Sequence, residues 1–213
     1  MKTDDLVRLL SNHVEPVRSG ALWPRIAVTA GGGGLLALGL MLVFQGLRPD
    51  VANAVYTGPF WMKLALPALL VLGCLVSLNR VARPGAPLAG LWRWIAFPVV
   101  AVWSMAAAEL YGAMPGDRSA LILGTTWAWC MSSVALLSLP VLVPLFWAMR
   151  QLAPTRLALA GACAGLLAGA VGALVYALHC PETSASFLGL WYVLGIAAPA
   201  AAGALLGPRL LRW

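Results

Sequence analysis

Six apolar stretches, each long enough to cross a lipid bilayer, recur along this chain of 213 residues. A helix needs about 20 apolar residues to cross about 30 Å of hydrocarbon. Charged residues make up only 10% of the chain, whereas a soluble domain carries about 25%. We therefore predict an all-α fold, a polytopic integral membrane protein built as a bundle of six transmembrane helices. The charged residues that bound the apolar stretches place the spans at residues 26–47, 60–79, 91–108, 121–148, 157–178 and 187–206.

Basic residues are distributed unevenly between the two sides of this predicted bundle. The side that holds the N-terminus carries eleven of the fourteen Lys and Arg residues, whereas Arg48, Lys63 and Arg118 lie on the other side. Lys and Arg near span ends favour the cytoplasmic side of a membrane. We therefore expect both termini in the cytoplasm. The domains are a cytoplasmic partner-binding segment at 1–25, the transmembrane domain at 26–206 and a short cytoplasmic tail at 207–213.

The scatter of the basic residues argues against nucleic-acid binding, although the net charge is +7. A nucleic-acid-binding surface gathers its Lys and Arg residues on one exposed face. Here they lie between apolar runs, so we expect no direct contact with nucleic acid. The lipid bilayer is the expected surroundings for most of the chain.

Small residues recur every four positions in the last two predicted spans. The fifth span contains Gly161, Gly165 and Gly169, and the sixth contains Gly203 and Gly207. This spacing lets two helix backbones approach closely. The pattern favours a contact within one bundle, and association of two copies into a homo-oligomer is the alternative.

Few chemically reactive residues fall within the spans. Lys63 and Glu109 lie near outer span ends, where we expect their side chains to reach headgroups or water, so a transport pathway is not indicated. The two histidines, His13 and His179, lie on opposite sides, and the chain has no Cys-x-x-Cys pair of the kind that thiol oxidoreductases use. We therefore predict that the protein is not an enzyme and requires no cofactor.

The segment before the first span predicts a short amphipathic helix in the cytoplasm. Thr3 can cap a helix whose first turn holds two aspartates, and Pro16 stops it. Such a short helix is marginal alone, and its single Arg8 fits a membrane surface less well than an apolar groove with basic edges on a protein. A surface-bound or disordered tail is the alternative. The residues predicted to contact the partner are Asp4, Asp5, Leu6, Leu9, Leu10 and Val14.

The four cysteines sort into two pairs. Cys74 and Cys163 lie toward the cytoplasmic half of their spans, where we interpret them as small buried hydrophobes. Cys130 lies in the outer part of the fourth span, and Cys180 lies in the outward turn after the fifth, facing an oxidising compartment. This pair predicts either a redox switch through a disulfide or thiolate ligands for a soft metal ion as signal, with His179 and Glu182 as auxiliary metal ligands. The alternative is that Cys130 and Cys180 are two unrelated buried cysteines without a shared role.

Several of these features together resemble one family. They are the start MKTDDLVRLL followed by Pro16-Val17, the six-span hydropathy, Cys130 in the fourth span and the turn His179-Cys180-Pro181-Glu182. The chain resembles the negative-regulator-of-sigma-F family, bacterial inner-membrane anti-sigma factors that hold an extracytoplasmic-function sigma factor until stress releases it. The resemblance implies that the N-terminal segment binds the sigma factor. It also implies that the cysteines matching Cys130 and Cys180 sense metals or oxidants.

We therefore expect a multi-pass anti-sigma factor of the bacterial inner membrane. It would sequester an extracytoplasmic-function sigma factor and release it in response to metal or oxidative stress sensed by periplasmic-side cysteines. A small membrane permease or a metal-handling membrane protein is one alternative, and it would need a polar path through the spans. A thiol redox enzyme is the other, and turnover of a quinone or dithiol substrate would reveal it.

Overall fold

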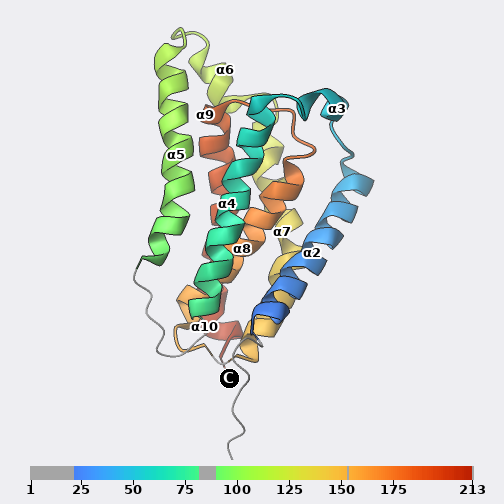
Figure 1. Cartoon of the computed structure of the whole chain (residues 1–213), viewed down its shortest axis with the longest axis vertical. Helices are drawn as coiled ribbons and strands as arrows, with labels where there is room; N and C mark the ends of the chain where they lie inside the picture. The colour runs from blue at the N-terminus through green and yellow to red at the C-terminus, as the bar shows by residue number, and fades with distance from the viewer. Residues whose placement is uncertain (1–21, 82–89, 153, 213) are drawn as a thin grey trace, which may run out of the picture.

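Long helices occupy each apolar stretch of the chain. The computed structural model describes residues 22–81, 90–152 and 154–212, and every regular element within them is helical (Figure 1). Six of these helical segments are long and apolar enough to cross a membrane, so the predicted all-α chain with six such segments is confirmed. The long helices are α2 (Leu22–Phe44), α4 (Gly58–Val81), α5 (Leu91–Gly112), α7 (Trp127–Arg150), α8 (Leu157–Tyr176) and α10 (Val193–Leu210). The short helices are α3 (Val51–Ala54), α6 (Arg118–Leu123), α9 (Ala185–Phe187) and the π-helix η1 (Leu188–Tyr192). The predicted N-terminal amphipathic helix lies outside the described residues.

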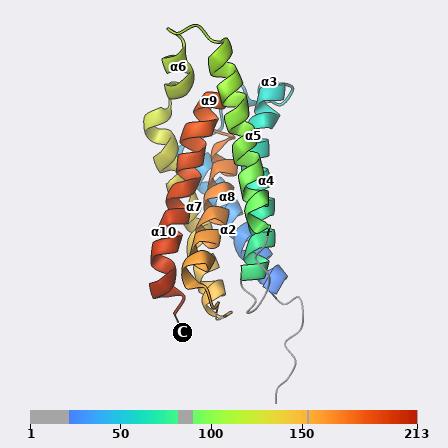
Figure 2. The same cartoon turned by 90° about the vertical axis from the view of Figure 1, so that its left-hand side faces the viewer.

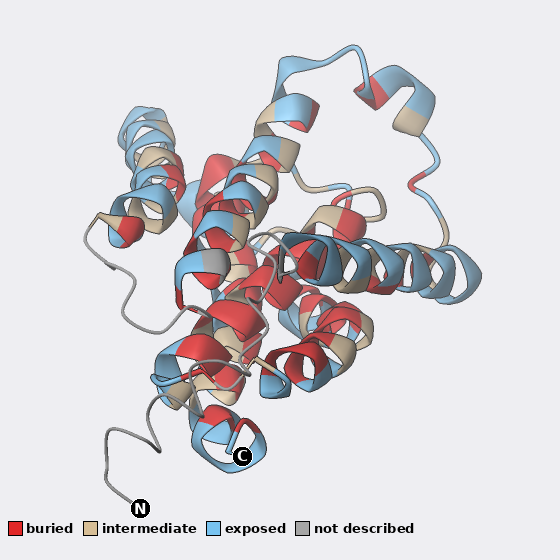
Figure 3. Cartoon of the chain, turned by 60° about the horizontal axis from the view of Figure 1, so that its bottom comes forward, coloured by how far each residue is buried: buried red, intermediate tan, exposed pale blue. Residues whose placement is uncertain are grey.

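The helices differ in how far the bundle encloses them. In α8, 72% of the span is buried among the other helices, whereas in α5 only 17% is buried. Helix α8 packs against α2, α4, α7 and α10, while α5 lies alongside α4 at one side of the bundle (Figure 2). Buried residues therefore gather toward the middle, and exposed faces turn outward (Figure 3). An apolar face that turns outward is the arrangement expected of a helix that meets lipid.

Helices α8 and α10 meet backbone to backbone. A Cβ atom added at Gly161 would overlap the carbonyl oxygen of Gly203, and one added at Gly165 would overlap that of Pro199. A Cβ atom at Gly169 would lie 2.8 Å from the carbonyl oxygen of Ile196. The small residues predicted to mediate close helix packing therefore do so within one chain.

The predicted fourth span is broken near its outer end. Residues 121–123 belong to α6, and α7 begins only at Trp127. Gly124 has a φ of 56°, which glycine adopts easily, and the chain changes direction there. The Glu182 carboxylate accepts hydrogen bonds from the Thr125 backbone N–H at 2.7 Å and from its hydroxyl at 2.6 Å. The break places Cys130 in the first turn of α7, directly beside the connections at that end.

The predicted sixth span contains an irregular turn. Helices α9, η1 and α10 run on from one another over Ala185–Leu210, with a π-helical turn at Leu188–Tyr192. A π-turn disrupts the regular hydrogen-bond ladder of an α-helix. The indole N–H of Trp103 on α5 donates to the Gly189 carbonyl at 2.8 Å, so a neighbouring helix satisfies this backbone group.

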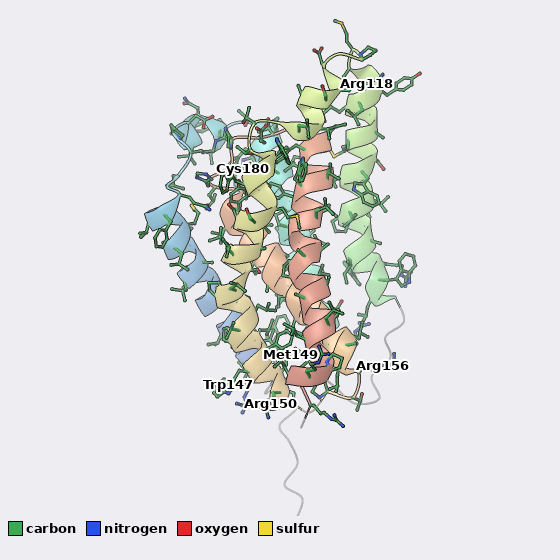
Figure 4. The ribbon with its side chains drawn as sticks, turned by 180° about the vertical axis from the view of Figure 1, so that it is seen from behind. Arg118, Trp147, Met149, Arg150, Arg156 and Cys180 are labelled. Carbon is green, nitrogen blue, oxygen red and sulfur yellow. The ribbon has the colours of Figure 1, made fainter. Side chains whose placement is uncertain are left out.

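Charged residues divide between the two ends of the bundle. At one end of the bundle, α4, α7 and α10 finish and α2, α5 and α8 begin (Figure 1). This end, hereafter the arginine end, holds seven described arginines and no described carboxylate. The other end, hereafter the thiol end, holds the four described carboxylates, together with Cys180 and Arg118 (Figure 4). The arginines of the arginine end are Arg25, Arg80, Arg93, Arg150, Arg156, Arg209 and Arg212. The carboxylates of the thiol end are Asp50, Glu109, Asp117 and Glu182.

Candidate functional site

Cys130 and Cys180 belong to one buried cluster at the thiol end. Both have an exposed fraction of 0%, and both are free thiols. The Cys130 backbone N–H donates to the carbonyl of Thr126, and the Thr126 hydroxyl lies 3.8 Å from the Cys180 sulfur. The turn after α8 therefore presents Cys180 to the first turn of α7. The structure brings the two predicted switch residues to the same place.

Lys63 is the most unusual residue of this cluster. Its side chain is fully buried, and its ammonium donates to the Cys180 carbonyl oxygen at 2.5 Å. The same nitrogen lies 5.6 Å from the centre of the Tyr192 ring, within the range of a cation–π interaction. The expectation that Lys63 reaches headgroups or water is wrong, because a backbone carbonyl and an aromatic ring take the place of water around its charge.

Glu109 also has protein partners in place of headgroups. Its carboxylate accepts hydrogen bonds from the Ser184 hydroxyl at 2.9 Å, the Ser186 backbone N–H at 2.8 Å and the Ser186 hydroxyl at 2.6 Å. These bonds fasten the start of α9 to α5. Glu109 is therefore a structural anchor for the connection that follows Cys180.

His179 and Glu182, the predicted auxiliary ligands, contact other groups. The His179 Nδ1 atom lies 2.9 Å from the Gly46 carbonyl oxygen, and Glu182 accepts its hydrogen bonds from Thr125. Among the described residues there is no cluster of three or more His, Cys, Asp and Glu side chains arranged to hold a metal ion. The metal-binding groups that this buried cluster contains are the thiols of Cys130 and Cys180, and thiols suit a soft ion better than a hard one.

Further polar atoms are buried around this cluster without hydrogen bonds. They are the Tyr192 hydroxyl, one guanidinium nitrogen of Arg48 and the Gln45 carbonyl oxygen. Gln45 uses its amide nitrogen to donate to the Ser133 hydroxyl at 3.2 Å. Buried polar atoms of proteins normally have partners, so this end of the bundle retains spare hydrogen-bonding capacity.

Arg48 uses its remaining nitrogens in an ion pair at the edge of the cluster. It donates two hydrogen bonds of 2.6 Å to the carboxylate of Asp50, which is exposed. The hydrogen bonds from Arg48 lower the pKa of the Asp50 carboxyl below its ordinary value, and Asp50 raises the pKa of Arg48 in turn. The pair ties the loop after α2 to the start of α3.

Reasoning from the sequence missed Lys63 and Tyr192 as members of the site. A lysine inside an apolar stretch was the available signal for the first, because such a residue usually faces the bundle interior. Tyr192 carried no comparable signal. It is buried at the end of the π-turn, which hydropathy does not register.

The second cysteine pair lies in a different cluster. Cys74 on α4 and Cys163 on α8 have exposed fractions of 0% and 6% and pack in a core that includes Leu78, Leu145 and Leu167. Both are free thiols. Their surroundings agree with the interpretation as small buried hydrophobes.

Trp147 lies at the arginine end (Figure 4) and is 70% exposed, and it lines two hollows there. One, of about 410 Å³, lies between α2 and α7 and includes Arg25. The other, of about 320 Å³, lies between α7 and α10 and includes Arg150. Both are mainly apolar with a basic rim, as expected where helices meet lipid tails and headgroups. The predicted partner-binding residues precede α2 in the sequence and lie outside the described residues.

Comparisons with known proteins cover nearly the whole chain. The family model described as negative regulator of sigma F matches residues 10–213. A protein of Azospira oryzae named probable anti-sigma-F factor NrsF is 43% identical over 213 residues, which is 100% of both chains. The anti-sigma-F factor NrsF of Caulobacter vibrioides is 40% identical over 217 residues, again 100% of both chains. No solved structure matches. The chain belongs to the negative-regulator-of-sigma-F family, whose members are regulatory anti-sigma factors and not enzymes.

Proposed function

We propose that this protein is a membrane-bound anti-sigma factor that holds a sigma factor at the cytoplasmic face of the bacterial inner membrane and releases it when its outward thiols react. The observation that carries the proposal is full-length membership of a family of anti-sigma factors. The division of the bundle into an arginine end and a thiol end supports it, because a signal and a partner would then meet opposite ends.

The proposed orientation places the arginine end in the cytoplasm. Seven described arginines without a described carboxylate at one end are the distribution that the positive-inside rule associates with a cytoplasmic face. A reporter enzyme that is active only in the periplasm should be silent when fused after Trp213. A cysteine introduced at Asp117, in a chain lacking its native cysteines, should react with a membrane-impermeant thiol reagent, and protection there would invert the orientation.

The proposed partner is a sigma factor of the extracytoplasmic-function class, bound by the segment before α2. The relatives are named for their action on sigma F, and the acidic amphipathic pattern of residues 4–14 suits a groove with basic edges. Neutralising Asp4 and Asp5 should weaken binding and reduce its salt dependence, because fewer charges would meet the partner.

Co-purification of the intact protein with its cytoplasmic partner tests this part of the proposal. Changing Leu6 and Leu10 to Asp should abolish capture of a sigma factor, because both residues belong to the apolar stripe. Changing Ser11 and Asn12 to Asp adds the same charge off the stripe and should preserve capture. Undiminished capture by the Leu6/Leu10 variant would exclude this binding mode.

The proposed signal site is the pair Cys130 and Cys180, reacting with an oxidant or with a soft metal ion. The contact between Cys180 and the first turn of α7 supports the pairing, and so does the burial of both thiols beside Lys63. The proposal predicts that Cys130→Ser and Cys180→Ser each prevent release of the partner by oxidant or metal, and that the double variant is no worse than either. Cys74→Ala with Cys163→Ala is the matched control, and this variant should release its partner as the parent does. Normal release from the Cys130/Cys180 double variant would remove the thiols from the mechanism.

The proposed coupling runs along α8. Reaction of the thiols would move the turn after α8 relative to α7, and the close α8–α10 contact at Gly161 and Gly165 would carry that movement to the arginine end. Such coupling requires that the signal bind one arrangement of the bundle more tightly than the other.

A further inference from the structure

Lys63 places a basic side chain inside the thiol end, where no carboxylate of the described residues pairs with it. Among the described residues the only ion pair joins Arg48 to Asp50, so no carboxylate lies within salt-bridge distance of Lys63. Its nitrogen instead contacts the Cys180 carbonyl and the Tyr192 ring. A buried cation without a counter-charge is costly, and such residues within membrane spans usually serve function.

The other charges near the thiols are already engaged. Cys130 and Cys180 are buried in the same cluster, and Lys63 contacts the Cys180 carbonyl. Glu182 is partly exposed and is held by Thr125 at the start of α7, and the charge of Arg48 is matched by Asp50. Among the described residues Lys63 is therefore the buried basic group at this site that lacks a carboxylate partner, and the groups of its cluster that can become negative include the two thiols, which are more acidic than the Tyr192 phenol.

The possible reaction products of the two thiols differ in net charge, so they differ in whether they could balance the charge of Lys63. A disulfide is neutral, and so is the complex of a divalent ion with two thiolates. A monovalent soft ion behaves differently, because Cu⁺ and two thiols give a bis-thiolate complex of charge −1 and two protons that leave to water. Only this complex both uses the two thiols and matches the single charge of Lys63.

Coordination number favours the same class of ion. Structural zinc is almost always bound by four protein ligands, whereas Cu(I) and its analogue Ag(I) accept two thiolates as a complete set. The described residues around Cys130 and Cys180 form no cluster of three or more ligands. The Tyr192 hydroxyl is buried without a hydrogen bond in the same cluster as the two thiols, and it is a donor available to a sulfur that becomes anionic.

We propose that Lys63 sets the ion specificity of the thiol site: with Cys130 and Cys180 it forms a site for a monovalent soft cation, in which the buried ammonium balances the negative bis-thiolate complex. This inference rests on the proposed role of the two cysteines as the signal site. It adds the class of ligand and a specificity-determining residue.

Binding of Ag(I) and Cd(II) to the reduced full-length protein in detergent tests the inference. Ag(I) replaces Cu(I) because it is not oxidised in air, and each affinity is measured by competition with a chromophoric chelator. Lys63→Gln retains a donor for the Cys180 carbonyl but removes the charge, whereas Lys63→Arg retains the charge. Lys63→Gln should weaken Ag(I) binding at least about tenfold and Cd(II) binding less than about threefold, and Lys63→Arg should bind Ag(I) within about threefold of the parent.

Three results would overturn the role of Lys63. They are unchanged Ag(I) binding in Lys63→Gln, equal losses for both ions, and the same loss in Lys63→Arg as in Lys63→Gln. Should Lys63→Gln fail to fold, as judged by tryptophan fluorescence on heating, Thr126→Asp provides a second test. It adds a negative charge near the Cys180 sulfur with Lys63 intact, so it should weaken Ag(I) binding selectively, and undiminished binding would contradict the inference.

The cysteine variants separate this inference from the proposed function. Cys130→Ser with Cys180→Ser should lose Ag(I) binding, while Cys74→Ala with Cys163→Ala should retain it. Parental Ag(I) affinity in the first variant would overturn the inference together with the metal arm of the proposed signal site, and the release assay with oxidant would then decide the thiol switch alone. Loss of Ag(I) binding there, with no selective effect of Lys63→Gln, would overturn the inference alone.

Discussion

Two pairs of cysteines are almost equally buried in this bundle, in surroundings of opposite character. Cys74 and Cys163 lie among aliphatic side chains toward the arginine end. Cys130 and Cys180 lie at the thiol end beside a buried lysine and a tyrosine hydroxyl without a hydrogen bond. Burial alone therefore does not distinguish the two pairs. Their neighbours do, because among the described residues only the second pair lies beside a lysine and a hydroxyl without a hydrogen bond.

The two clusters are joined by α8, whose residues contribute to both. Replacing Gly165 with Leu should destabilise the bundle more than any change at a thiol or a charged residue, because the new side chain would meet the backbone of α10 at Pro199. We expect a loss of more than about 3 kcal/mol, the upper range of overpacking. The yield of monodisperse protein and its melting temperature measure the effect.

Gly39→Leu is the matched control for this change. Gly39 lies on α2, where an added Cβ atom meets nothing within 4 Å. Leucine at this position should be tolerated with little change in melting temperature. If the two leucine variants melted alike, the close α8–α10 contact would not be a determinant of stability.

Replacing Cys with Ser should separate the two pairs by stability. A hydroxyl at Cys74 would be buried among aliphatic groups, and an unpaired buried hydroxyl costs about 1–3 kcal/mol. At Cys130 the loss should be smaller, because polar groups lie nearby. Chemical denaturation in detergent, followed by tryptophan fluorescence, gives both values. Equal losses would show that the two sites do not differ in polarity.

Hydropathy sufficed to predict the six long helical segments, and the charge pattern sufficed to predict that most basic residues gather at one end of the bundle. The apolar stretches of the sequence became six helical segments, and the arginines gathered at one end, because both properties are local and survive any packing arrangement. The close contact of Gly161 with Gly203 was also predictable, since small residues at this spacing leave room for a backbone.

The environment of Lys63 was not predictable in this way. Whether a lysine near a span end reaches water depends on which loops cover that end, and here the turn that contains Cys180 does so. That turn is held by Glu109 and Glu182, whose partners lie more than fifty residues away in the sequence. The site is thus built from long-range contacts between connections, and single-sequence patterns do not encode them.

Replacing Tyr192 with Phe should affect stability and Ag(I) binding differently. The Tyr192 hydroxyl is buried without a hydrogen bond, so its removal should leave stability unchanged or raise it by up to about 1 kcal/mol. The same variant should bind Ag(I) more weakly, because a donor to the sulfur is lost. Tyr111→Phe, at a residue that is 91% exposed, should change neither property. A destabilised Tyr192→Phe protein would mean that the hydroxyl has a partner in the resting state.

The smallest expected effect comes from the Arg48–Asp50 pair at the rim of the thiol end. The hydrogen bonds from Arg48 lower the pKa of the Asp50 carboxyl below its ordinary value of 3.8. A carboxyl whose pKa is depressed on folding stabilises the protein fully above its unfolded pKa, and this contribution disappears as the pH falls through the folded value. Asp50→Asn should therefore melt slightly below the parent at about pH 7, and the gap should close as the pH falls below about 4.

Asp117→Asn is the control for this change, because Asp117 is exposed and has no ion-pair partner among the described residues. It should follow the parent across the same pH range. Arg48 remains buried in the Asp50→Asn variant and loses its counter-charge, so its environment at neutral pH should resemble that of the parent with Asp50 protonated. A gap between Asp50→Asn and the parent that persisted unchanged at low pH would show that the asparagine acts by distorting the loop after α2 and not by removing a charge.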